Sequence, residues 1–123
     1  MAKQKQIVGK RILLVDHDLG ARDSIKLLLT TDRHEVVEAT GGTEAIELLK
    51  NQPFDLAILD YFMPGMQGSQ VALHFRDMAP SLPILVITAC LETLGDPDKP
   101  VKAVIGTPLS IEAFRRTIAK LLS

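Results

Sequence analysis

Several polar residues of this 123-residue chain directly follow apolar runs. Asp16 ends the first run and Asp60 ends the third. Thr88 lies at the end of the fourth, and Asp18 stands two residues beyond Asp16. If the runs are parallel strands, these side chains approach one crevice, where carboxylates repel each other unless a cation neutralises them. The pattern therefore predicts a site for Mg²⁺, which prefers oxygen ligands.

A carboxylate beside a bound cation can also act as a nucleophile. Attack on a phosphorus atom would give an aspartyl phosphate. Aspartates also commonly cap turns at strand ends, which is the alternative for each residue taken singly. The occurrence of Asp16 and Asp60 together with Thr88 favours a phosphoryl site.

His17 stands between two of these aspartates in the stretch VDHD, residues 15–18. Imidazole is a poor ligand for a hard cation and suits zinc, copper or nickel better. A lone histidine is more often a solvated or packed residue than a metal ligand. The sequence is compatible with both interpretations of His17, and only the first predicts a transition-metal site.

The segments that must position these residues alternate between two kinds of periodicity. We expect strands at 11–15, 34–39, 54–60, 83–89 and 102–106. Amphipathic stretches predict helices at 20–32, 41–52, 69–79 and after Ser110, which is a suitable N-cap. Such alternation indicates βαβ units and a mostly parallel sheet with helices on both faces. Gly95, Pro97 and Pro100 leave only one or two helical turns within 91–100.

Composition places limits on partners and location. The formal net charge of −1 gives no electrostatic reason to expect direct nucleic-acid or membrane binding. Residues 1–10 are expected to form a flexible basic tail, and residues 11–123 a single domain. Cys90 is the only cysteine and is expected in the core, which fits a cytoplasmic protein.

Three stretches, ILLVDHD, LAILDYFMPGMQG and PILVITA, resemble the receiver domains of two-component response regulators. The similarity runs from about Lys10 to the C-terminus, and its most specific block is D-x-x-M-P-x-M-x-G, which starts at Asp60. This resemblance implies a flavodoxin-like fold with a five-stranded parallel sheet in the order 2-1-3-4-5. The fourth helix of that fold would be short or irregular here, at 91–100.

The resemblance also implies roles for individual residues. Asp60 would accept a phosphoryl group from a histidine kinase or phosphotransfer protein and lose it slowly by hydrolysis. Asp16, Asp60 and the backbone carbonyl of Phe62 would hold Mg²⁺, and the Thr88 hydroxyl would hydrogen-bond the phosphoryl group. Asp18 is a further possible metal ligand.

The sequence departs from the family pattern at three positions. His17 replaces an acidic residue that ligates the metal, which would weaken Mg²⁺ binding. Thr107 replaces the lysine that would contact the phosphoryl group, so a charge-assisted hydrogen bond is lost. Val104 stands where the family commonly has a switch aromatic. Lys99 and Lys102 are candidates to supply the missing positive charge.

Two functions follow from these features. The first is a phosphorelay receiver that accepts phosphate on Asp60 and signals through an effector protein or domain. The second is a receiver-like interaction module that does not switch by Mg²⁺-dependent phosphorylation. An aspartate-nucleophile phosphatase would need an acid two residues after its nucleophile, and that position is Phe62. We therefore do not expect an enzyme.

Overall fold

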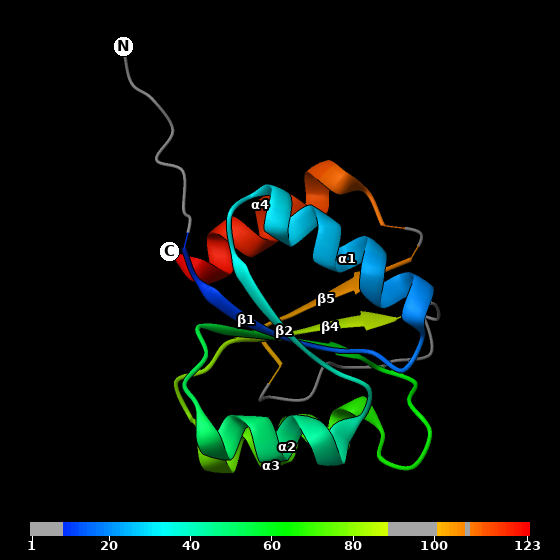
Figure 1. Ribbon diagram of the computed structural model, residues 1–123, viewed down its shortest axis with the longest axis vertical. Helices are drawn as coiled ribbons and strands as arrows, with labels where there is room; N and C mark the ends of the chain where they lie inside the picture. Colours follow the sequence, from blue (N-terminus) through cyan, green and yellow to red (C-terminus); the bar gives the residue numbers. More distant parts are fainter. Residues whose placement is uncertain (1–8, 89–100, 108) are drawn as a thin grey trace.

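Five parallel strands form one sheet in the order β2-β1-β3-β4-β5 in the computed structural model of the chain (Figure 1). The structure describes residues 9–88, 101–107 and 109–123. The strands are β1 (Arg11–Val15), β2 (Glu35–Ala39), β3 (Leu56–Asp60), β4 (Ile84–Thr88) and β5 (Ala103–Gly106). The predicted strand order is confirmed.

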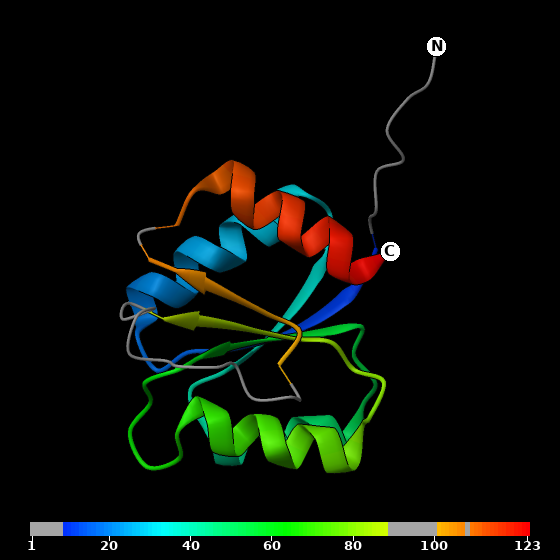
Figure 2. The same ribbon diagram turned by 180° about the vertical axis from the view of Figure 1, so that it is seen from behind.

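Helices cover both faces of this sheet. They are α1 (Leu19–Thr31), α2 (Gly42–Asn51), α3 (Gly68–Met78) and α4 (Ile111–Leu122). Helices α1 and α4 lie on one face, and α2 and α3 lie on the other, as the front and back views agree (Figures 1 and 2). The expected irregular helix at 91–100 and Cys90 lie outside the described residues, as does most of the predicted tail.

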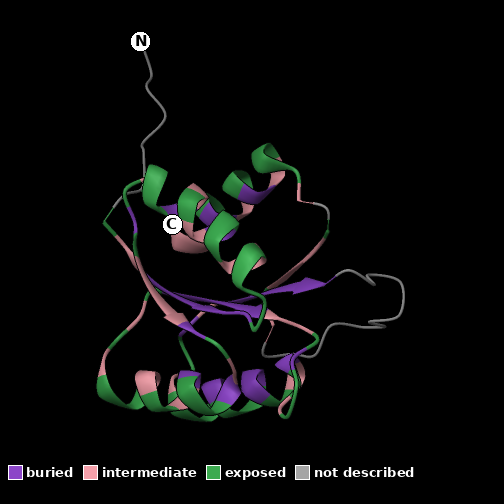
Figure 3. Ribbon diagram, turned by 45° about the vertical axis from the view of Figure 1, so that its right-hand side comes forward, coloured by how far each residue is buried: buried purple, intermediate pink, exposed green. Residues whose placement is uncertain are grey.

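The central strands are buried on both sides because their sequences are continuously apolar. Alternate side chains of β1 enter two separate cores: Leu13 and Val15 pack in the core on the α2–α3 side, and Ile12 and Leu14 in the core on the α1–α4 side. All four are at most 1% exposed. Figure 3 shows the buried central strands between helices whose outer surfaces are exposed.

Side-chain caps fix where several helices begin. Asp18 Oδ2 accepts a hydrogen bond from the Ala21 backbone N–H at 2.8 Å at the start of α1. Ser110 Oγ accepts one from the Ala113 N–H at 3.3 Å at the start of α4, which confirms the predicted cap. Such caps satisfy backbone donors that have no partner within the helix. They hold the helix N-termini at the edge where the strands end.

Strand register brings the predicted site residues to that edge. Asp60 pairs with Ile87 across β3 and β4, and Thr88 pairs with Gly106 across β4 and β5. Val15, the residue before Asp16, ends β1 opposite Ala39. The carboxyl ends of the strands are therefore aligned, as the sequence argument requires.

The loop between β3 and α3 returns tightly against the strand it leaves. The Gly68 N–H donates to the Tyr61 carbonyl at 3.0 Å, and Met63 is 4% exposed. A Cβ on Gly68 would lie 2.6 Å from the Asp60 carbonyl oxygen and 2.9 Å from the Tyr61 Cα. Gly65 has a φ of +85°, a conformation that favours glycine.

Substitution Gly68→Ala should destabilise the fold because its new methyl group meets backbone rather than a movable side chain. We expect a loss of about 1–3 kcal/mol in the free energy of unfolding, the usual range for overpacking. Gly20→Ala in α1 is the matched control, since its Cβ would make only an ordinary 3.6 Å contact. Chemical denaturation measures both; equal stability of the two variants would contradict the close contact at Gly68.

Candidate functional site

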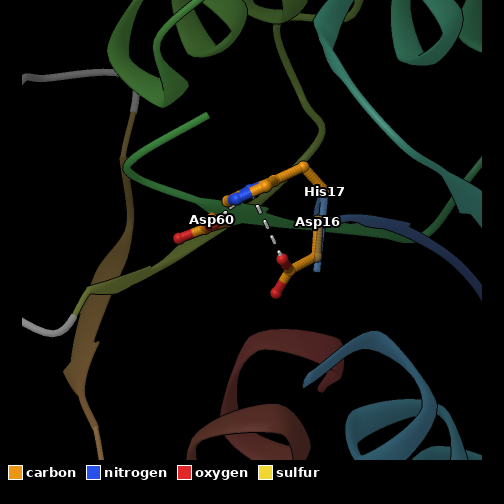
Figure 4. A group of neighbouring side chains, drawn as sticks. All are labelled: Asp16, His17 and Asp60. Atoms are coloured by element: carbon orange, nitrogen blue, oxygen red, sulfur yellow. Dashed lines mark ion pairs between the residues drawn. The ribbon is translucent and has the colours of Figure 1, made fainter. Parts of the chain in front are cut away.

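Asp16, His17 and Asp60 converge at the carboxyl edge of the sheet (Figure 4). The His17 Nδ1 lies 3.3 Å from Asp60 Oδ2 and 4.0 Å from Asp16 Oδ1. One ligand atom of each residue lies within 4.8 Å of the other two. The structure thus brings together the two aspartates predicted to share a site, with the histidine between them.

The Asp16 side chain and backbone are held by several short contacts. Its Oδ1 accepts the Asp18 N–H at 2.9 Å, and its N–H donates to the Ala39 carbonyl at 3.1 Å. The Arg22 guanidinium donates through Nη1 to the Asp16 carbonyl at 2.8 Å. Asp16 is 6% exposed, so these contacts fix a buried carboxylate in place.

Sequence reasoning missed the Arg22 contact and the ion-pair network that supports it. Arg22 Nε lies 3.1 Å from Glu38 Oε1, and Lys26 Nζ lies 2.9 Å from Glu38 Oε2. The signal in the sequence is a basic pair four residues apart on α1, with an acidic residue within the following strand. Only the packing of α1 beside β2 shows that these residues meet.

Asp60 is a partly buried carboxylate in an unfavourable environment. Burial raises its pKa, and the negative charge of Asp16 raises it further. A hydrogen bond from the Phe62 backbone and the neighbouring His17 act in the opposite direction and do not cancel the rise. The ionised form of Asp60 is therefore held at a cost, which a bound cation would relieve.

A cavity of about 360 Å³ opens beside both aspartates. It is lined by residues from the segment between β1 and α1, from α1, β3 and β4, and from the segment after β5: Asp16, Asp18, Ala21, Ser24, Ile25, Asp60, Ile87, Thr88, Thr107 and Leu109. The Thr107 N–H donates to the Thr88 carbonyl at 2.9 Å. Both predicted phosphoryl-contacting threonines thus share this cavity with Asp60.

Asp18 lines the cavity but does not join the three-residue cluster. Its Oδ2 caps α1 through the Ala21 N–H. The cap typically contributes about 1 kcal/mol and gives Asp18 a structural role at the rim of the site. Metal coordination by Asp18 stays a prediction.

The side chains of Phe62, Val104 and Lys102 are not part of the cluster of Asp16, His17 and Asp60. The Phe62 side chain is 44% exposed and packs edge-on against Tyr61 at a ring separation of 4.8 Å. Val104 lies in β5 and packs against the core on the α2–α3 side. Lys102 precedes β5, and its N–H bonds to Ile84, the first residue of β4.

Lys102 is therefore at the end of the sheet opposite Asp60. Gly106 lies four positions further along the chain, about 13 Å at the usual rise along a strand. That distance makes it a poor substitute for a lysine at Thr107. Lys99 and Pro108 lie outside the described residues.

The donor set fits the Mg²⁺ that such a site predicts only in part. Asp16 and Asp60 supply the carboxylate oxygens that Mg²⁺ prefers. His17 supplies a nitrogen, which Mg²⁺ does not favour, and lacks the negative charge of a carboxylate. The two carboxylates therefore suit Mg²⁺, and the imidazole of His17 does not.

Comparison with known sequences gives consistent matches. Residues 12–95 match the family model of the response regulator receiver domain. Response regulator MprA of Mycobacterium sp. (strain KMS) is 39% identical over 79 residues, which cover 64% of this chain and 34% of MprA. MprA of Mycobacterium leprae is 32% identical over 115 residues, 91% of this chain and 50% of that protein. The chain thus spans half or less of these curated relatives.

Solved structures match over most of the chain. Response regulator TrrA of Thermotoga maritima, in complex with Mg²⁺-BeF, gives a TM-score of 0.85 at 28% identity, over 92% of this chain and 99% of TrrA. TrrA in complex with histidine kinase ThkA gives 0.85 at 30% identity, over 93% and 99%. These matches confirm the predicted flavodoxin-like receiver fold. No described helix is long and apolar enough to cross a membrane.

Substitution Asp60→Asn should raise the melting temperature at pH 7 in metal-free buffer. Because the pKa of Asp60 is raised by folding, its ionised form destabilises the native state above that pKa. The advantage of asparagine should shrink as the pH falls through the raised pKa and vanish below the ordinary aspartate value of about 4. Calorimetry across this pH range measures it.

Asp77→Asn provides the control, because the Asp77 side chain is 75% exposed on α3. We expect no comparable gain from that change. A lower melting temperature for Asp60→Asn at pH 7, or a rise in melting temperature that does not depend on pH, would contradict the raised pKa of Asp60.

Proposed function

Because this chain belongs to the response regulator receiver family of two-component signalling, we propose that it accepts a phosphoryl group on Asp60. The observation that carries the proposal is the shared cavity of Asp60, Asp16 and Thr88 at the carboxyl edge of the sheet. A closely spaced acidic pair is costly to fold, and phosphoryl transfer to a carboxylate nucleophile would make use of one. The loop from Asp60 to Gly68 carries the complete D-x-x-M-P-x-M-x-G block, which adds support.

The reaction would use Asp60 as a nucleophile. Its carboxylate oxygen attacks phosphorus in a phosphohistidine of the donor, the new O–P bond forms as the P–N bond breaks, and the freed imidazole takes up a proton. Mg²⁺, when bound, would neutralise charge between the carboxylates and the phosphoryl oxygens. Asp16 and the Phe62 carbonyl are the groups that would hold it with Asp60.

Thr88 and Thr107 would contact the transferred group. Thr88 ends β4 and lines the cavity beside Asp60, so we propose that its hydroxyl donates to a phosphoryl oxygen. Thr107 is exposed at the same cavity and can donate only a neutral hydrogen bond. A phosphorylated state held by two hydroxyls should be less stable than one held by a lysine.

The phosphodonor would be a histidine kinase or a histidine phosphotransfer protein. TrrA, which is similar over nearly the whole chain, has been solved with the histidine kinase ThkA. We further propose that phosphorylation is read by an effector protein or domain. The match to this chain covers at most half of each MprA protein, so the part of MprA outside the match is a candidate for such an effector.

Incubation with a small acyl phosphate should add one phosphoryl group, detected by intact mass. Asp60→Asn should abolish the gain because the nucleophile is removed, and Asp77→Asn should leave it unchanged. The incubation should be repeated at several Mg²⁺ concentrations. No mass gain at any concentration would overturn the proposal and leave a receiver-like interaction module that does not switch by phosphorylation.

Thr107→Lys should increase the phosphorylated fraction at steady state. A charged donor in place of a hydroxyl is expected to stabilise the phosphoryl group by about 1 kcal/mol, or about fivefold in occupancy. Thr107→Gln is the control for side-chain length without charge. An equal rise in both variants, or none in Thr107→Lys, would show that position 107 does not contact the phosphoryl group.

A further inference from the structure

His17 departs from the family pattern at the point where the structure brings three donor atoms together. Its Nδ1 faces the two carboxylates in Figure 4, although the side chain is 45% exposed and has solvent on its other side. The imidazole lies over the gap between Asp16 and Asp60, where its Nδ1 contacts Asp60 Oδ2 at 3.3 Å.

We propose that this site binds a divalent transition metal of the zinc class, with His17 Nδ1 as a ligand beside the Asp16 and Asp60 carboxylates. Zinc accepts imidazole nitrogen and carboxylate oxygen together, whereas Mg²⁺ selects oxygen and keeps much of its water. The inference rests on the proposed function, because it concerns the metal that serves the same site.

The distances suit such an ion. Zinc–ligand bonds of about 2.0–2.2 Å place neighbouring tetrahedral ligands about 3.4 Å apart. The His17 Nδ1 and Asp60 Oδ2 are already 3.3 Å apart. The 4.0 Å separation from Asp16 Oδ1 and the 4.8 Å limit of the cluster require side-chain movements of only about 1 Å, without a change of fold.

The surroundings leave room for the rest of a coordination shell. The His17 side chain is 45% exposed, so solvent can supply a fourth ligand beside it, and the cavity of about 360 Å³ adjoins the two aspartates although His17 does not line it. Three protein ligands with one open position are typical of zinc sites that act on a substrate. The site would therefore bind the metal without closing Asp60 off from its phosphodonor.

A histidine in place of a carboxylate at position 17 shifts the metal preference of the site from Mg²⁺ toward Zn²⁺. An acidic residue at position 17 would strengthen the Coulombic attraction for any dication and add an oxygen for Mg²⁺. Histidine removes that charge and adds a nitrogen, which costs Mg²⁺ affinity and favours Zn²⁺ and Co²⁺. The relative affinity for Zn²⁺ and Mg²⁺ is thus the quantity that His17 controls.

Calorimetric titration of the 123-residue chain with Zn²⁺ and with Mg²⁺ tests the proposal. We expect tighter binding of Zn²⁺, and a shift of the His17 ring nitrogen resonances on zinc addition. His17→Asp should lower the ratio of Zn²⁺ to Mg²⁺ affinity by at least about tenfold, the lower end of what even outer-shell ligands contribute. His17→Gln should weaken Zn²⁺ without strengthening Mg²⁺.

Controls exclude adventitious zinc binding elsewhere. His74→Ala removes an exposed histidine on α3, and Cys90→Ser removes the only thiol; both should keep the wild-type ratio. An unchanged ratio in His17→Asp, unmoved His17 resonances, or zinc binding that depends on His74 or Cys90 would overturn the inference.

The two proposals fail separately. An Asp60-dependent mass gain in Mg²⁺ with no effect of His17 on metal preference would refute the zinc-class site and keep the phosphoacceptor. A His17-dependent zinc site with no mass gain in either metal would refute the phosphoacceptor and keep the metal inference. Circular dichroism of each variant confirms that it is folded.

Discussion

The structure depends on keeping two carboxylates close together at the edge of a buried sheet. Asp16 is almost fully buried. The burial of Asp60 and the negative charge of Asp16 together raise the pKa of Asp60. The adjacency of β1 and β3 brings the two carboxylates together, and the side chains of these strands fill two cores that offset the repulsion. The Asp18 N–H and the Arg22 guanidinium then fix the position of Asp16. Stability supplied by the cores holds a site that by itself opposes folding.

Much of this arrangement could be predicted from sequence because its signals are local. Continuous apolar runs indicate buried parallel strands, and Asp16, Asp60 and Thr88 follow from their positions at strand ends. The link between Arg22 and Glu38 could not be predicted, since it joins two elements whose relative placement comes from packing. The position of the His17 ring is a side-chain rotamer, on which sequence periodicity gives no information.

The two departures from the family pattern change the charges around Asp60 in complementary ways. Thr107 leaves the end of β5 with a neutral hydroxyl, and His17 places a nitrogen-bearing side chain at the end of β1. Within the described residues, Lys102 is too far along β5 to restore the lysine. The nitrogen-bearing side chain beside Asp60 thus lies on the β1 side of the sheet.

The close contact at Gly68 has an evolutionary consequence. Helix α3 begins directly against the backbone of Asp60, so a side chain at position 68 would have to displace the strand that carries Asp60. His17 and Thr107 are exposed, and their replacement disturbs no core contact. Selection can thus change these two side chains at the rim of the site while the scaffold stays constant. A lineage of such domains would diverge in chemistry faster than in shape.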